Sequence, residues 1–434
     1  MNNIKQKIFF FGLIFQILCG VSIYAQASNK NDVLRYGDYI YKESIKSLTL
    51  SRPANVMSLP VITLGSKEQL LLQFDELTTD YRTFRFTFIH CDAAWNPTQD
   101  LSLSEYLSGF FEDQIYDYTF SSNTIQNYIH YKALFPTEKM RPKLSGNHLL
   151  VVYEDGYADD PFFTLRFMVL EPKVSIVDAK AIQDQRPSTR LEMQRVVFGI
   201  NTDGYYIPFP ERDLKVMIRQ NERWDNVKYL KPLNNRGAVL NYTHYNDENV
   251  FTGINEYRYF DIKTLITNTL NVGKIERGNE GAYYVTLLTD IPRRRNYEVA
   301  SDINGKFLIK TDDYHDSNIE SEYAWVSFFF KTNIPVQNGS VHIVGNLTQN
   351  RLDESSEMTY NYDRKGYEIS LYLKQGYYNY LYAFVENGSF AADIPFFEGN
   401  HWETSNDYYI YVYHREAGDK HDRLIAFEKT AINF

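Results

Sequence analysis

The sequence predicts a mainly β protein made of tandem immunoglobulin-like or fibronectin-like β-sandwich domains with one or two short helices. Most segments alternate apolar and polar residues with a period of two, which is typical of half-buried strands. Aromatic residues make up 16% of the chain, including 36 tyrosines and 29 phenylalanines, and they can fill the space between two sheets. Turn residues at regular intervals between these segments favour sandwiches over α/β folds.

The first predicted domain, 30–172, holds the clearest strands. The segments 69–77 and 82–90 are interpreted as one pair of strands joined by a short polar turn. The segments 147–156 and 162–172 flank an Asp-Gly turn, which predicts a hairpin. A proline then ends the last strand and marks the boundary of the domain.

Two segments have helical patterns. In 102–114, Ser102 and Glu105 have the spacing of a capping box, and apolar residues follow on one face. The segment 259–271 has a weaker helical pattern. We therefore expect a short amphipathic helix over 102–114 and a second, less regular one over 259–271.

The rest of the chain is expected to form a middle β-rich domain, 173–312, and a C-terminal β-sandwich domain, 313–434. The acidic stretch 311–322 separates them, because it has no apolar periodicity. The strands predicted in these two domains are 213–221, 281–290, 325–333, three strands within 357–388, and 407–416.

Residues 1–25 have the pattern of a secretory signal peptide. Lys5 and Lys7 precede an apolar stretch over 8–21, and small residues suited to cleavage follow. No later stretch is apolar enough to span a bilayer as a helix. The sequence therefore predicts an exported mature protein that does not insert into the membrane.

Charge and cysteine content exclude several classes of function. Loss of the two leader lysines changes the formal net charge from −10 to −12, which disfavours binding to nucleic acid. Cys91 is then the only cysteine, so neither an intrachain disulfide nor a cysteine zinc site can form. No HExxH, GxSxG, phosphate-loop or calcium-loop spacing is present. We expect no cofactor and no bound metal.

The stretch "FIHCDAAWNP" at 88–97 contains the most suspicious residues. His90 and Cys91 are the residue types of a nucleophile and its base, so a hydrolase using Cys91 is one hypothesis. In a regular strand, however, adjacent residues point to opposite sides of the sheet. His90 is then expected to be a hydrogen-bonded histidine at the rim of the core, and Cys91 a small buried apolar residue.

The residues after this strand are interpreted as a turn. Asp92 and Asn96 have turn chemistry. Trp95 is expected either to anchor the following segment to the sheet or to be exposed for a partner.

Rows of tyrosine in the C-terminal domain leave a second hypothesis open. Aromatic side chains on one face of a sheet can bind sugar rings, although cross-strand packing gives the same pattern. The runner-up function is therefore glycan binding. Its candidate residues are Tyr378, Tyr380, Tyr382, Phe384, Trp402, Tyr409, Tyr411 and Tyr413.

An ordered series of motifs resembles the plug protein family of the type IX secretion system of Bacteroidota. The series is "FIHCDAAWNPTQDLSLSEYLSGFFEDQI" (88–115), "NYIHYKALFP" (127–136), "KLSGNHLLVVYEDG" (143–156) and "RFMVLEP" (166–172). The match is strongest over 82–172 and continues more loosely to the end of the chain.

The resemblance implies a periplasmic protein without a catalytic centre. Members of the family bind the inner mouth of the large outer-membrane translocon barrel and close its pore when no substrate is passing. The resemblance marks two groups of residues. The structural signature comprises His90, Cys91, Tyr106, Gly146 and Gly156, and the expected contacts with the translocon are Asp92, Trp95 and Asn96.

Overall fold

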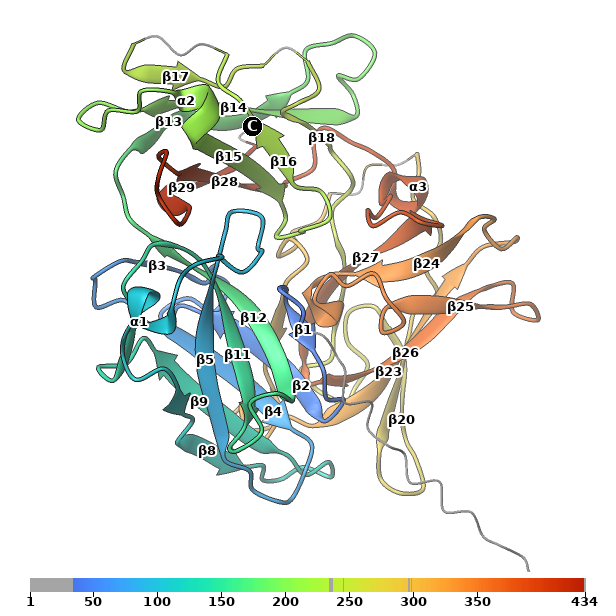
Figure 1. Ribbon diagram of the computed structural model, residues 1–434. Coiled ribbons are helices and arrows are strands. Elements are labelled where there is room, and N and C mark those ends of the chain that lie inside the picture. Colours follow the sequence, from blue (N-terminus) through green and yellow to red (C-terminus); the bar gives the residue numbers. More distant parts are fainter. Residues whose placement is uncertain (1–33, 234–236, 245, 296, 298, 433–434) are drawn as a thin grey trace, which may run out of the picture. The chain divides into compact units, whose positions relative to one another are not determined.

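Strands are the main regular elements of the structure, a computed structural model that describes residues 34–233, 237–244, 246–295, 297 and 299–432. They form three β-sandwiches, with the first in blue to green and the third mainly in orange (Figure 1). The predicted mainly β fold is confirmed. The described residues belong to one compact unit, and the predicted signal peptide lies outside them.

The first sandwich packs two antiparallel sheets around a phenylalanine-rich core. Its first layer contains β1 (Tyr39–Ile40), β3 (Val61–Thr63), β5 (Phe84–Cys91), β7 (Asp113–Gln114), β11 (Gly146–Glu154) and β12 (Pro161–Leu170). Its second layer contains β2 (Ile45–Ser51), β4 (Leu70–Glu76), β9 (Ile129–Phe135) and β8 (Asp117–Phe120). The short strands β6 (Leu107–Gly109) and β10 (Met140–Pro142) pair with each other. The rings of Phe74 and Phe84 meet across the two layers, 5.3 Å apart.

The predicted hairpin is confirmed, because β11 and β12 pair antiparallel. The predicted pairing of 69–77 with 82–90 is wrong. β4 pairs with β2 and β9, whereas β5 lies in the facing layer and pairs with β11 and β7. Both strands bury a phenylalanine row, and facing layers satisfy that pattern as well as neighbouring strands do.

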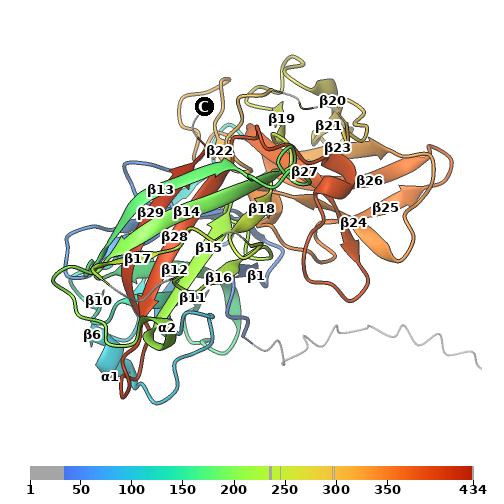
Figure 2. The same cartoon turned by 90° about the horizontal axis from the view of Figure 1, so that it is seen from above.

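The second sandwich combines strands from two distant parts of the chain. One layer contains β13 (Ser175–Gln183), β14 (Met193–Asn201), β17 (Val239–Asn241) and β18 (Val250–Thr252). The other contains β16 (Lys228–Leu230), β15 (Leu214–Gln220), β28 (Asp407–His414) and β29 (Arg423–Ala431). Figure 2 shows the last two strands, in red, running among the green strands of this sandwich. A single parallel pair, Leu170 with Leu424, continues this layer into the first sandwich.

The third sandwich is one nine-stranded sheet that packs against itself. Its strands are β19 (Arg258–Asp261), β20 (Val272–Arg277), β21 (Tyr283–Leu287), β22 (Phe307–Ile309), β23 (Tyr323–Lys331), β24 (Gly339–Val344), β25 (Glu357–Asn361), β26 (Gly366–Lys374) and β27 (Gly376–Glu386). β25 pairs with both β24 and β26 and so connects the two layers. The stacked rings of Phe330 and Tyr382, 4.1 Å apart, join β23 to β27 through the core.

Strand pairing crosses the ranges predicted for the second and third domains. β19, β21 and β22 lie within 173–312 but pair with strands of 313–434, while β28 of 313–434 pairs with β15 of 173–312. The chain thus leaves the second sandwich near 253–258 and returns to it near 399–406. The partner of a strand depends on which distant surface it buries, and local alternation carries no such information. The number of separately folding domains stays a prediction.

Helices are short throughout the described residues. They are α1 (Leu103–Tyr106), α2 (Pro210–Asp213), α3 (Pro395–Glu398) and the 3₁₀ turn η1 (Asn346–Thr348). The helix predicted over 102–114 forms only its first turn, where the Ser102 N–H donates to Oε2 of Glu105 over 2.7 Å. Leu107 is extended and begins β6, which pairs with β10. One turn of helix is not stable by itself, so pairing with a strand determines the conformation of the rest.

The second predicted helix, over 259–271, is wrong. The segment begins as β19 and continues as irregular chain. Side-chain oxygens of Asp261 and Thr264 accept hydrogen bonds from the N–H groups of Lys263 and Ile266. Such local bonds compete with the hydrogen bonds of a helix.

Candidate functional site

His90 is buried at the end of β5, on the same side as the phenylalanine row. Its Nδ1 lies 2.8 Å from Oγ1 of Thr98, and its Nε2 lies 3.1 Å from the carbonyl oxygen of Ser145. A carbonyl only accepts, so Nε2 carries the proton and Nδ1 accepts from the threonine hydroxyl. Burial lowers the pKa of His90 to about 4, and the ring is therefore neutral at physiological pH.

Cys91 points to the other side of the sheet and is fully buried. It belongs to a cluster with Leu149, Val151 and Met168, which packs against Tyr411 of the second sandwich. Burial raises the pKa of the Cys91 thiol to about 12. Since both nitrogens of His90 bond elsewhere, this histidine and cysteine form no nucleophile–base pair.

Two histidines that the sequence did not connect to His90 lie beside it. His148 is directly opposite His90 in the pairing of β11 with β5, with ring centroids 4.9 Å apart. His421 contacts the same ring at 5.4 Å from the loop between β28 and β29. Only the strand register and the long-range packing bring these rings together. Within the described ranges, no group of three or more histidine, cysteine and acidic side chains could hold a metal ion.

The residues after β5 connect the first sandwich to the second. Oδ1 of Asp92 accepts from the N–H groups of Ala94 and Asn96, each over 2.9 Å, which confirms the predicted turn. The Ala93 N–H donates to Oδ2 of Asp422, which precedes β29, over 2.9 Å. Nζ of Lys215 in β15 lies 2.8 Å from the same carboxylate.

Trp95 is only 5% exposed and forms part of this connection. It meets Trp224 of the second sandwich edge-on, with ring centroids 5.3 Å apart. The guanidinium of Arg166 lies over both rings, and that of Arg219 lies over Trp224 at 4.0 Å. Cation–π contacts of this kind are strongest where the cation is desolvated. Of the two roles expected for Trp95, the structure places it in an anchoring position, while Asn96 is exposed and Asp92 half-buried.

The other three residues of the structural signature, Tyr106, Gly146 and Gly156, have different surroundings. Tyr106 is buried beside His90, and burial raises its pKa to about 12. Gly146 has φ +116°, and a Cβ there would lie 2.5 Å from the carbonyl oxygen of Asp422 and 3.2 Å from Nε2 of His90. Gly156, with φ +86° in the β11–β12 turn, has open space around it, so only its backbone conformation favours glycine.

The tyrosine rows do not form a platform for sugars. The tyrosines of both rows are buried, with exposed fractions of at most 2%. They are Tyr378, Tyr380, Tyr382, Tyr409, Tyr411 and Tyr413. The first three pack inside the third sandwich, as Tyr380 does against Phe328 at 5.1 Å, and the last three pack in the cluster between the first and second sandwiches. These rows are therefore the cross-strand packing that was weighed against glycan binding.

A second buried junction joins the first sandwich to the third. Asp75 of β4 is fully buried, and its Oδ1 lies 2.6 Å from Nδ1 of His130 on β9. Its Oδ2 accepts from Nζ of Lys374 over 2.6 Å and from the hydroxyl of Tyr323 over 2.7 Å. Although burial alone would raise it, the pKa of Asp75 is lowered, because Lys374 and His130 favour the carboxylate. The Tyr323 hydroxyl also bonds Oγ of Ser47 on β2, 2.7 Å away.

This junction forms part of the wall of a cleft of about 710 Å³ between the two sandwiches. Lys374 lies over the ring of Tyr128 and also donates to the carbonyl oxygen of Asn318. Its ammonium is thus fully engaged and does not serve as a free amine. No local pattern predicts this cluster, because its members lie on five strands, β2, β4, β9, β23 and β26, that are distant in the sequence.

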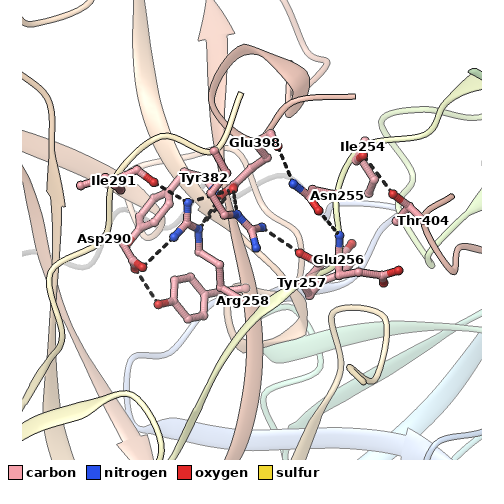
Figure 3. Close-up of polar contacts among 12 residues, drawn as sticks. Ile254, Asn255, Glu256, Tyr257, Arg258, Asp290, Ile291, Tyr382, Glu398 and Thr404 are labelled. Atoms are coloured by element: carbon pink, nitrogen blue, oxygen red, sulfur yellow. Dashed lines mark hydrogen bonds and ion pairs between the residues drawn. The ribbon is translucent and has the colours of Figure 1, made fainter. Parts of the chain in front are cut away.

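A third network lies where the third sandwich meets the two chain connections to the second (Figure 3). Glu398 of α3 is fully buried and accepts from Nε of both Arg258 and Arg293, over 3.0 and 2.8 Å. Arg258 also donates to Asp290 over 2.7 Å, and that carboxylate accepts from the hydroxyl of Tyr382. Burial would raise the pKa of Glu398, but the two guanidinium groups lower it below its usual value.

The same network holds the connections 253–258 and 399–406 side by side. The side-chain amide of Asn255 donates to the carbonyl oxygen of Glu398 over 3.0 Å. The Thr404 hydroxyl donates to the carbonyl oxygen of Ile254 over 3.0 Å. Two parallel connections with buried bonds between them restrict hinge motion more than one free linker does.

The neutral, buried state of His90 predicts a pH-dependent contribution to stability. Its pKa is about 4 in the folded protein and 6.5 in an unfolded chain. The contribution is therefore complete above pH 6.5 and is lost as the pH falls toward 4, up to about 3 kcal/mol. Urea unfolding at several pH values should show the wild type losing stability relative to His90→Gln, which keeps one donor and one acceptor. The exposed His315→Gln variant is the control, and parallel pH profiles for wild type and His90→Gln would contradict the prediction.

In the part of the chain that the structure covers, no helix is long and apolar enough to cross a membrane. Three sandwiches joined by buried junctions define a mainly β scaffold. Residues 45–171 match the family model of the type 9 secretion system plug protein 1st domain. The chain belongs to the type IX secretion system plug protein family.

Among solved structures, the chain is similar to a hypothetical protein from Parabacteroides merdae ATCC 43184, with 35% identity and a TM-score of 0.88. That match covers 92% of this chain and 100% of the other. Native alpha-2-macroglobulin from Escherichia coli, at 9% identity and a TM-score of 0.14, covers 47% of this chain and 95% of its own. That likeness is too small to carry an argument. A search of curated protein sequences finds no match.

Proposed function

We propose that this protein is a non-enzymatic plug of the type IX secretion system. It binds the periplasmic mouth of the outer-membrane translocon barrel and closes the pore when no substrate is passing. Membership of the plug family supports this role, since residues 45–171 match the first domain of plug proteins. The predicted signal peptide would deliver the chain to the periplasm.

The observation that carries the proposal is that all three sandwiches are joined by buried contacts. Asp75 joins the first sandwich to the third, and Glu398 fixes the connections between the third and the second. The Trp95–Trp224 contact joins the first to the second. Removing one partner from a buried charge pair costs about 3–5 kcal/mol, so each charged junction resists opening. A plug that seals a water-filled pore needs this stiffness.

The two alternative functions lose the residues on which they depended. A hydrolase would need a reactive Cys91, but the thiol is buried and faces away from His90. A glycan-binding protein would need exposed tyrosines, but those rows lie in buried apolar clusters. The plug proposal requires neither a reactive group nor an open aromatic platform.

Co-purification tests whether the translocon is the partner. A tagged copy of the full-length protein, purified from detergent-solubilised cells, is expected to retain one very large barrel protein. The same cells without the tag give the background. Recovery of the protein without any outer-membrane barrel, under several mild detergents, would count against the proposal.

Outer-membrane permeability tests the closing role. Deleting the gene is expected to make cells sensitive to large antibiotics that do not cross an intact outer membrane. Deleting the translocon as well should restore the barrier, because the leak then has no path. A leak that persists in the double deletion would mean that the protein does not close this pore.

A further inference from the structure

One edge of the first sandwich exposes a group of aromatic side chains. We call it the aromatic edge, and five of its six members lie within residues 110–120. Their exposed fractions are Tyr81 43%, Phe110 65%, Phe111 45%, Tyr116 63%, Tyr118 38% and Phe120 50%. Single exposed apolar residues are common on proteins, whereas contiguous groups mark interaction sites.

The aromatic edge contains two sets of contacts. In the first, the rings of Tyr81 and Tyr118 are 4.4 Å apart, and those of Tyr118 and Phe120 are 6.1 Å apart. In the second, Nζ of Lys139 lies 5.4 Å from the ring centroid of Tyr116, and the backbone oxygen of the same lysine accepts from the Phe110 N–H over 2.8 Å. Residues 116–118 join the two sets along the chain.

β8, which carries Tyr118 and Phe120, is the edge strand of the second layer. Of the described strands in the second layer, β8 pairs with β9 alone, and all four of its residues are exposed. Figure 1 shows β8 at the outer margin of the first sandwich. Tyr118 and Phe120 share one face of the strand, beyond the point where the facing layer covers the core. The fold therefore leaves both rings partly exposed at the edge of the sheet.

Carboxylates outnumber arginines in three segments that border the aromatic edge, although Lys132 and Lys42 pair with two of them, Asp117 and Asp160. The segments 80–85, 112–117 and 154–160 together contain eight carboxylate residues and two arginines. Arg85 bonds to both Glu112 and Asp155, which holds the three segments together. Among the described residues, neither Asp80 nor Asp159 has an ion pair.

This combination of aromatic rings and carboxylates favours one class of partner. Rings attract cations through their faces, and unpaired carboxylates attract lysine and arginine. A surface of anionic lipid headgroups would be repelled by the same carboxylates. Tyrosine and phenylalanine at a protein interface also exclude water around such charge pairs.

We propose that the aromatic edge is the surface through which this protein docks onto a partner protein, at a basic patch with apolar side chains. The inference rests on the proposed function, in which that partner surface belongs to the rim of the translocon. The contact residues that the sequence suggested, Asp92, Trp95 and Asn96, lie in the turn at the junction between the first and second sandwiches. The aromatic edge adds a separate surface, carried by 110–120 and Tyr81.

The first test removes rings from the surface without touching the core. The triple variant Phe110→Ser, Tyr116→Ser, Phe120→Ser is expected to recover at least about tenfold less barrel protein on co-purification. The matched control is Tyr206→Ser, Tyr362→Ser, Phe390→Ser, whose members are even more exposed and lie in the other two sandwiches. Both variants should keep the wild-type circular dichroism spectrum and melting temperature.

A charge arm tests the chemistry of the partner. Asp80→Lys combined with Asp159→Lys is expected to weaken recovery about tenfold at low salt, with a smaller difference at high salt. An unchanged recovery, or a stronger one, would overturn the assignment of a basic partner. Vesicles of phosphatidylethanolamine and phosphatidylglycerol should not sediment the wild type, and sedimentation that the triple variant loses would assign the surface to lipid instead.

The outcomes separate this inference from the proposed function. If the wild type and the triple variant retain the barrel equally, the docking surface is wrong and the plug role stands. If the wild type retains no barrel, the plug role itself fails. A wild type that is dimeric by light scattering, with a monomeric triple variant, would assign the aromatic edge to self-association and overturn the inference.

Discussion

Asp75→Asn is expected to lower the free energy of unfolding by about 3–5 kcal/mol. The substitution keeps the shape of the side chain but removes its charge. The ammonium of Lys374, which is 2% exposed, then loses the carboxylate 2.6 Å away. His130 and Tyr323 bond to different oxygens of Asp75, and asparagine keeps only one oxygen acceptor for the two. Urea unfolding at neutral pH measures the loss, and Asp203→Asn, an exposed aspartate of the second sandwich, is the control.

A double variant separates the buried charge from the packing around it. Adding Lys374→Met removes the unpaired ammonium and places a thioether against the ring of Tyr128, which the lysine now covers at 4.1 Å. We expect the double variant to recover at least half of the lost stability, as in other buried ion pairs replaced by apolar groups. A double variant less stable than Asp75→Asn would mean that Lys374 acts through its other bond, to Asn318.

The single variant Asp75→Asn also tests whether the junction holds the first and third sandwiches together. Hydrogen exchange is expected to rise first in 318–323 and at the end of β26, before the core of either sandwich opens. Exchange that rises only with global unfolding would mean that the two sandwiches do not separate there. That result would strengthen the argument for a stiff plug, because the junction would then be part of one cooperative unit.

Much of the fold could be predicted from the sequence, because local alternation reports which residues face a core. The strands around 84–91, 146–154 and 161–170 follow from that pattern, and so does the opposite orientation of His90 and Cys91. The alternation of side chains between the two faces of a strand is a local property, so it does not depend on which strands pair with it.

What the sequence could not predict depends on contacts between distant segments. β28 and β29 complete the second sandwich although the third separates them from it along the chain. The helix predicted over 102–114 stops after one turn because 107–109 pairs with 140–142. Local propensity is weak against a strand partner that buries Leu107.

The candidate site could also be predicted only in part from the sequence. The turn chemistry of Asp92 and the buried state of Cys91 follow from sequence, whereas the neighbours of both come from the second sandwich. Asp422 reaches the Ala93 N–H from 329 residues away. The signature stretch is therefore a junction between sandwiches, and no local pattern could identify it as one.

Glu398→Gln is expected to cost about 3–5 kcal/mol and to loosen the third network. Glu398 pairs with Arg293 and shares Arg258 with Asp290. A glutamine can accept one hydrogen bond but cannot neutralise two buried guanidinium groups. Its amide N–H₂ would also face cationic donors or the Tyr382 N–H, which now donates to Oε1 over 2.9 Å.

Urea unfolding of Glu398→Gln, with the exposed Glu280→Gln of the same sandwich as control, measures this loss. Hydrogen exchange should rise together in 253–258 and 399–406, because Asn255 and Thr404 hold both connections to the network. A loss below about 1 kcal/mol is typical of solvated ion pairs and would mean that water reaches the network. A large loss without faster exchange in the connections would assign Glu398 to the third core alone. The second and third sandwiches would then be free to hinge, which a pore-closing plug does not tolerate.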